Sequence, residues 1–212
     1  ATTSLGAIWS SCSPDFGVNG VLDRFGQIEP KLIFACTDYF YNGKHINCIP
    51  RLKEIQREIK SLDAMITFSS KSSVSSTLES TISFESLCEN NAEDINFVQL
   101  PFDHPLYIMY SSGTTGQPKC IVHSAGGSLI QHLKEHQLHT NIKPTDVVFY
   151  YTTCGWMMWN WLVSVLASEA TIVLYDGSPF FSSPSILLDI AEREKISIFG
   201  VSAKYISAIE KQ

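Results

Sequence analysis

The chain has 212 residues, of which 44% are hydrophobic and 17% are charged, so disorder over its whole length is excluded. It carries 15 Lys and Arg against 21 Asp and Glu, a formal net charge of -6, and has no basic block. This balance argues against a nucleic acid or an anionic membrane as a partner. No apolar run reaches the roughly 18 to 20 residues that span a bilayer.

The first half of the chain predicts helices and strands in alternation. A short helix is expected around residues 18–25 and a strand at 31–36, followed by a helix that begins near Pro50 and a strand at 64–68. Residues 69–86 then contain nine serines in eighteen positions. Such a stretch buries little apolar area, so we expect a surface linker or insert there.

The second half is more regular. Strands rich in β-branched and aromatic residues are expected at 146–152, 171–175 and 196–201. Between and after them lie three predicted helices: residues 157–168, which should be buried on several faces, one opened by Pro184 and one opened by Ser202. This alternation predicts an α/β fold with a mostly parallel β-sheet flanked by helices.

The densest chemical signal lies at residues 106–124, where an apolar strand enters a loop of glycines and hydroxyl residues that ends at Lys119 and a second strand. Gly113 and Gly116 allow the backbone to turn its N–H groups inward as an anion nest. Ser111, Ser112, Thr114 and Thr115 add hydroxyl groups, and Lys119 adds a compact positive charge. These features favour a polyphosphate site over an ordinary hairpin turn, although the spacing is not that of a Walker A motif.

A competing motif, His132-x-x-Glu135-His136, fits the H-x-x-E-H pattern of a zinc peptidase on a predicted helix. A third metal ligand has no clear candidate. Leu129, Ile130 and Leu133 form the expected buried stripe of this helix, which predicts that the histidines flank it on a solvated face. We therefore expect no metal site.

The sequence Tyr-Ser-Ser-Gly-Thr-Thr-Gly-Gln-Pro-Lys at residues 110–119 closely resembles the phosphate-loop signature of the adenylate-forming superfamily, which includes acyl-CoA synthetases, peptide-synthetase adenylation domains and luciferases. Residues 152–162 look like the version found in acetoacetyl-CoA synthetases, and residues 13–18 and 121–127 point the same way. The resemblance covers the whole chain except the serine-rich insert. One departure is Cys120, where many superfamily members carry Gly; acetoacetyl-CoA synthetases tolerate Cys or Ala there.

The resemblance implies an acid–thiol ligase that uses ATP, Mg²⁺ and coenzyme A as a co-substrate. Acetoacetate would attack the α-phosphorus of ATP to give an acyl-adenylate, and coenzyme A would then displace AMP. By position in the motif, the six residues 111–116 would cradle the phosphates and Lys119 would act as the catalytic cation. The acyl pocket would be lined by Gly155, Trp156, Met157 and Met158, and Lys44 would bind the coenzyme A nucleotide.

The same resemblance implies that residues 1–212 are part of one large N-terminal AMP-binding domain, with the insert at about 69–86 and without the C-terminal domain. We expect a cytosolic piece of a longer ligase that forms no acetoacetyl-CoA by itself. Two alternatives besides the zinc peptidase stay open: a truncated homologue that binds nucleotide without catalysis, and another short-chain acyl-CoA synthetase. The single Cys residues, with no C-x-x-C pair, are typical of reduced thiols in the cytosol.

Overall fold

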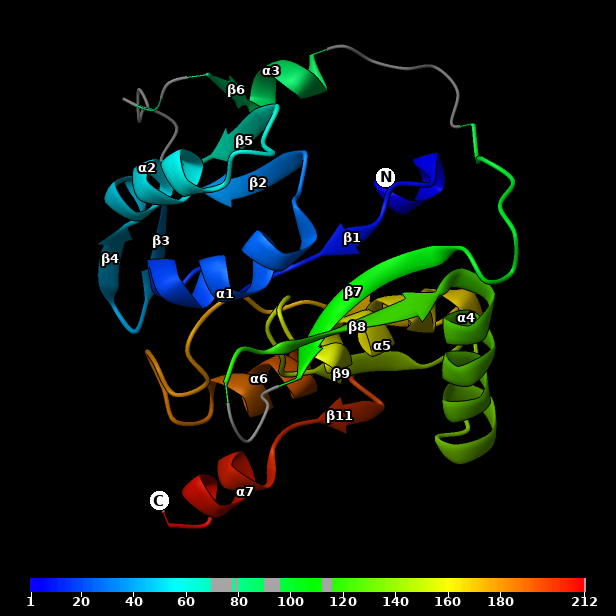
Figure 1. Ribbon diagram of the computed structural model, residues 1–212. Coiled ribbons are helices and arrows are strands. Elements are labelled where there is room, and N and C mark those ends of the chain that lie inside the picture. Colours follow the sequence, from blue (N-terminus) through cyan, green and yellow to red (C-terminus); the bar gives the residue numbers. More distant parts are fainter. Residues whose placement is uncertain (70–77, 79, 90–95, 112–115, 212) are drawn as a thin grey trace.

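The computed structural model describes residues 1–69, 78, 80–89, 96–111 and 116–211. This part of the chain contains three three-stranded sheets, in the orders β1-β7-β8, β2-β5-β6 and β10-β9-β11, and the separate hairpin β3-β4. All pairs are parallel except β7 with β8 and β3 with β4. The predicted α/β fold with mostly parallel pairing is therefore confirmed. In Figure 1 the β2-β5-β6 sheet lies at the top, the β9 sheet near the bottom, and β7 and β8 between them.

The strands are short and most follow the expected positions. Their bounds are β1 Trp9–Ser10, β2 Leu32–Cys36, β3 Asp38–Tyr41, β4 Lys44–Asn47, β5 Ala64–Phe68, β6 Thr81–Ser83, β7 Pro105–Ser111, β8 Lys119–Ser124, β9 Val147–Tyr150, β10 Thr171–Val173 and β11 Ile198–Gly200.

The helices include two 3₁₀ segments and one π segment. Their bounds are η1 Thr3–Leu5, α1 Val18–Ile28, α2 Ile49–Glu58, α3 Phe84–Cys88, α4 Ala125–Lys134, the π-helical η2 Glu135–His139, α5 Met157–Ser164, η3 Val165–Ser168, α6 Ile186–Arg193 and α7 Ala203–Ile209.

Strand β9 is the centre of its sheet and is covered on both faces. Val148 packs with Leu162 of α5 and Val165 of η3, whereas its neighbour Phe149 packs with Leu187 of α6 and with α7. Successive side chains of a strand point to opposite faces, so this division follows from the strand itself. The helices that connect the parallel strands therefore shield both sides of the sheet, as the alternating pattern predicted.

The sheet β2-β5-β6 has its own core. Val21 of α1 and Leu52 and Ile55 of α2 pack against Ile33 of β2 and Met65 of β5, and Met65 is fully buried. The apolar stripe predicted for α2 is confirmed, with Pro in the first turn of the helix. Burial of this face accounts for the position of both helices on one side of the sheet.

Two expectations about these elements are wrong in part. The serine-rich stretch is not a linker to its end: Thr81–Ser83 forms β6, which pairs with β5, and α3 follows directly. Its residues 70–77 and 79 lie outside the described residues. The helix expected at 157–168 changes to 3₁₀ geometry at Val165, and it leaves Val163 and Leu166 exposed because only one of its faces meets β9.

The burial expected for α4 is also wrong. Leu129 and Ile130 are exposed, whereas Ser128, His132 and His136 are buried, His136 completely. The two histidines lie on the side of α4 and η2 that packs against α5, where each finds a polar partner. A buried polar group that is hydrogen-bonded avoids most of its desolvation cost, which is why this face can be the inner one.

The histidine pair is held by the end of α5. Nδ1 of His132 lies 2.8 Å from Oγ of Ser164, and Nε2 of His136 lies 3.1 Å from the carbonyl oxygen of Trp161. The Ser164 hydroxyl donates to that same carbonyl at 2.8 Å. Burial lowers the pKa of both histidines, and the neighbouring His136 and His123 lower that of His132 further. Both rings are therefore packed in the neutral form.

This pair should make the fold sensitive to mild acid. In the unfolded chain each histidine takes up a proton near pH 6.5, whereas in the folded chain protonation needs a lower pH. The stabilising contribution of the two buried neutral rings is therefore present above about pH 6.5 and is lost as the pH falls below it. We expect the free energy of unfolding, measured with urea, to fall between about pH 7.5 and 5.5. His136→Phe keeps the ring volume and leaves the Trp161 carbonyl bonded to Ser164, so it should flatten this slope.

The exposed His139 provides the control, because His139→Gln should leave the slope unchanged. An equally steep slope in His136→Phe and the wild-type chain would contradict this assignment.

Candidate active site

The predicted phosphate loop joins β7 to β8. The two strands form an antiparallel hairpin in which Ser111 and Lys119 are register partners at the end that the loop connects. Ser112, Gly113, Thr114 and Thr115 lie outside the described residues. Gly116 has a φ of +94°, which favours glycine, and both Gly116 and Lys119 are exposed. The structure thus places Ser111 where the loop begins and Lys119 where it ends.

Helix α1 and strand β1 fix this hairpin from one side. The amide of Gln27 donates to the carbonyl oxygen of Pro118 at 2.8 Å. The Tyr110 hydroxyl is hydrogen-bonded to the Ser10 hydroxyl at 2.9 Å, and burial raises the pKa of Tyr110 to about 12, so the phenol stays neutral. The chain is therefore held in place both before and after the loop.

A second cation lies beside this support. The guanidinium carbon of Arg24 is 4.6 Å from the centre of the Phe16 ring and 5.8 Å from that of Tyr110. Its Nη1 donates to the carbonyl oxygen of Gly20 at 2.7 Å. Sequence reasoning did not single out Arg24, because a charged residue on an amphipathic helix is usually only solvated.

The predicted acyl segment begins where β9 ends. Trp156 is the N-cap residue of α5 and is 67% exposed, and Met157 follows it at 44% exposed, while Met158 is half-buried. The large apolar side chains at the start of α5 thus face away from the core, in contrast to Leu162 further along the helix. Exposed large apolar side chains at a strand-to-helix junction are what a pocket for a small acyl group requires.

Gly155 lies directly against the chain that leaves β1. A Cβ atom on Gly155 would lie 3.1 Å from the backbone nitrogen of Ser13 and 3.4 Å from Cys12, so only glycine allows this approach without a shift. The Ser11 hydroxyl also donates to the carbonyl oxygen of Cys154. The backbone that follows β1 therefore rests on the backbone that follows β9.

This contact brings two motifs to one edge. Strands β1 and β7 are parallel, so the chain leaves Ser10 and Ser111 on the same side of the sheet. The amide nitrogen of Asn160 in α5 lies 3.6 Å from the sulfur of Met109 in β7. This is a second contact between the sheet of β7 and the helix that covers β9. The start of the phosphate loop and the segment 155–158 thus share the carboxyl-end edge, where parallel sheets bind ligands.

The structure places Lys44 near this edge as well. It is exposed and is the register partner of Tyr41 at the tip of the β3-β4 hairpin. The hydroxyl of Tyr151, the residue after β9, donates to the carbonyl oxygen of Gly177 at 2.9 Å, and burial and the nearby Tyr41 phenol raise the pKa of Tyr151. The third predicted region therefore lies next to the acyl segment.

The alternative peptidase site has no support in the geometry. Within the described ranges, no three His, Cys, Asp or Glu side chains are grouped as a metal ion would require. His132 and His136 instead bond to Ser164 and Trp161 inside the core. Nor does any helix of the described residues combine the length and the apolar character needed to cross a membrane.

The chain is similar to known proteins over its whole length. The acetoacetyl-coenzyme A synthetase of Rhizobium meliloti (strain 1021) is 51% identical over 213 residues, which cover 100% of this chain and 33% of that protein. The acetoacetyl-CoA synthetase of Gallus gallus is 50% identical over 220 residues, with the same coverage. The structure of acetoacetyl-CoA synthetase from Streptomyces lividans matches with a TM-score of 0.93 and 45% identity, over 99% of this chain and 32% of that one.

The chain thus spans about a third of the length of the relatives it matches. The family model described as AMP-binding enzyme matches residues 1–211, which is nearly every position. This chain belongs to the AMP-binding enzyme family.

Proposed function

We propose that this chain forms part of the N-terminal domain of an acetoacetate–CoA ligase and carries its phosphate loop and acyl pocket. The observation that carries the proposal is the contact of Gly155 with Cys12 and Ser13, because it sets the acyl segment at the edge where the loop between β7 and β8 begins. The names of the relatives support acetoacetate as the acid. A cytosolic location, as expected from the sequence, belongs to the same proposal.

In the first step, a carboxylate oxygen of acetoacetate attacks the α-phosphorus of ATP, the bond to the β-phosphate oxygen breaks, and pyrophosphate leaves. In the second step, the coenzyme A thiolate attacks the acyl carbon and AMP leaves. Residues 111–116 would surround the phosphates, and Lys119 would offset the charge that builds on the departing pyrophosphate. Such a reaction depends on positioning and on fixed charges, which is the role we propose for this loop and Lys119.

Trp156 and the two following methionines would hold the acyl chain. The indole offers a rigid wall, and the methionine side chains can deform around a four-carbon acid. Lys44, on the hairpin whose tip lies near Tyr151, would contact the coenzyme A nucleotide. The described residues do not group side chains that fit a Mg²⁺ site, so we assign no step of the reaction to that ion.

The phosphate role can be tested with Lys119→Ala in a protein of the relatives' full length. Because Lys119 is exposed, the change should leave the unfolding midpoint unaltered. Loss of one fixed charge at the phosphates should slow acetoacetate-dependent ATP–pyrophosphate exchange by roughly a hundredfold. Lys31→Ala, at an exposed Lys that forms an ion pair with Asp63, is the matched control and should retain full exchange. Equal exchange rates in the Lys119→Ala and wild-type proteins would refute the role.

The acyl role can be tested by Met157→Trp and Met158→Trp, measured separately. Filling the pocket should exclude the four-carbon acetoacetate before it excludes the two-carbon acetate, so the ratio of kcat/KM for the two acids should shift toward acetate by about tenfold or more. Leu166→Trp, at an exposed position in η3, should not change this ratio. If neither methionine variant altered the ratio, the residues would belong to the helix packing alone.

A further inference from the structure

The β3-β4 hairpin needs an external support to hold its shape. It pairs Asp38–Tyr41 with Lys44–Asn47, and within the described residues these two strands join no larger sheet. A two-stranded hairpin is marginally stable by itself in water. Its position must therefore come from contacts with the rest of the protein: Tyr39 and Ile46 pack against the core, and further contacts lie at its base and at its tip.

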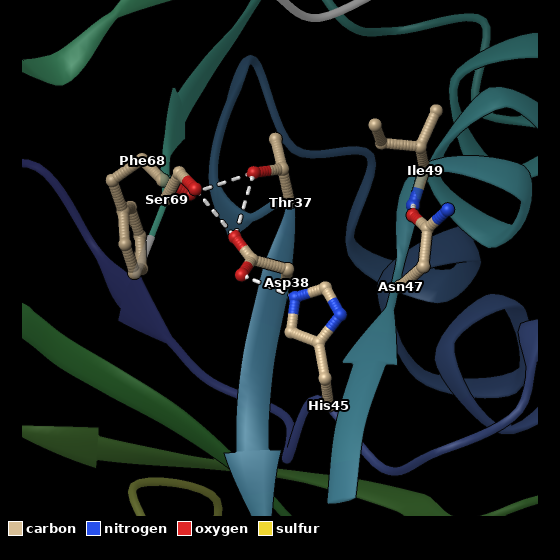
Figure 2. A network of polar contacts seen from close by, with 7 residues as sticks. All are labelled: Thr37, Asp38, His45, Asn47, Ile49, Phe68 and Ser69. Carbon is tan, nitrogen blue, oxygen red and sulfur yellow. Dashed lines mark hydrogen bonds and ion pairs between the residues drawn. The ribbon is translucent and has the colours of Figure 1, made fainter. Parts of the chain in front are cut away.

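The base is fixed by a carboxylate inside the protein. The side chain of Asp38 is 4% exposed, and one of its oxygens lies 2.8 Å from Nε2 of His45 on the opposite strand. The other oxygen accepts hydrogen bonds from the hydroxyls of Thr37, at 3.3 Å, and Ser69. Figure 2 shows these side chains converging on Asp38 from the link between β2 and β3, from β4 and from the chain that follows β5.

The backbone reinforces the same junction. The N–H of Thr37 donates to the carbonyl oxygen of Phe68 at 2.8 Å, and the N–H of Cys48 donates to the carbonyl oxygen of Thr37 at 2.8 Å. The start of the hairpin is thus bound to the end of β5, and its two ends are bound to each other. A buried carboxylate is costly without partners, so removing its charge or its acceptors should loosen the groups that converge on it.

The tip rests on the other half of the molecule. Asn42 and Gly43 both have positive φ, 49° and 74°, which is the backbone of a tight hairpin turn. A Cβ atom on Gly43 would lie 2.7 Å from the ring of Phe181, and the phenol of Tyr41 lies near enough to that of Tyr151 to raise its pKa. The hairpin therefore bridges the β2-β5-β6 sheet and the chain that leaves β9.

We propose that Asp38 is a positioning residue for the thioester-forming step: it locks the base of the hairpin so that Lys44, at the tip, is held in place for the coenzyme A nucleotide. This inference rests on the proposed function, and in particular on the role of Lys44. The lock lies at the far end of the hairpin from the tip, and its partners Thr37, His45 and Ser69 belong neither to the acyl segment nor to the described part of the phosphate loop. Asp38 should thus affect the second step without affecting adenylate formation.

The first measurement is hydrogen exchange of the backbone amides, followed by mass spectrometry on Asp38→Asn and on His45→Gln as a milder variant. The exchange of residues 38–47 should become at least tenfold faster in Asp38→Asn, and faster to a smaller extent in His45→Gln. Asp63→Asn is the matched control, because Asp63 forms only a 3.9 Å ion pair with Lys31 in which both side chains are 71% exposed. Unchanged exchange of the hairpin in both test variants would overturn the lock.

The second measurement uses a protein of the relatives' full length. In Asp38→Asn the KM for coenzyme A should rise at least tenfold, while acetoacetate-dependent ATP–pyrophosphate exchange stays within twofold of wild type. Faster hairpin exchange with an unchanged KM for coenzyme A would overturn the positioning role. Lys44→Ala separates the role of Lys44 from the lock at Asp38, because it should raise the KM for coenzyme A without altering amide exchange. If Lys44→Ala alone left this KM unchanged, the result would count against the proposed function and leave the lock standing.

Discussion

The contact between two stretches of backbone, at Gly155 and at Cys12 to Ser13, is the constraint on which the rest of the site depends. It lets the chain that follows β1 lie directly on the chain that follows β9, and β1 in turn pairs in parallel with β7. Any larger residue at position 155 would place its Cβ within 3.1 Å of a backbone atom that has little freedom to move. A single close approach therefore sets the spacing of the phosphate loop and the acyl segment.

The packing explains how this edge stays open while the core is closed. Val148 and Phe149 bury the middle of β9 on its two faces, so α5 and α6 are held firmly against the sheet. The first turn of α5 extends past that core, which leaves Trp156 and Met157 exposed. His132 of α4 and His136 of η2 hold the other end of α5 through Ser164 and Trp161. A rigid helix thus carries its large apolar side chains at the edge.

Sequence reasoning predicted the parts of this structure that follow from local pattern. The β-branched and aromatic run of β9 and the stripe of α2 identify a strand and a helix wherever they occur. The burial of α4 was predicted wrongly because Leu129 and Ile130 look like core residues, whereas the hydrogen bonds that bury His132 and His136 come from α5. The contact at Gly155 joins segments far apart in the chain, so no periodicity could reveal it.

The β3-β4 hairpin was missed for a related reason. Its strands carry Asp38, Lys44 and His45, which do not alternate with apolar residues, although Asn42-Gly43 is a recognisable turn signal. It is held by a buried carboxylate together with one small apolar contact, in which Tyr39 and Ile46 pack against the core. Polar networks of this kind depend on partners from several elements, such as Ser69 after β5, and these partners are known only from the fold.

A crystal structure of a protein of the relatives' full length would show whether the phosphate loop and the segment 155–158 form one site. The ligand would be a non-hydrolysable analogue of acetoacetyl-adenylate, with a sulfamoyl group in place of the phosphate. We expect the sulfamoyl group beside Ser111 and Lys119 and the acyl chain against Trp156 and the methionine that follows it. An analogue bound with either group away from these residues would contradict this expectation.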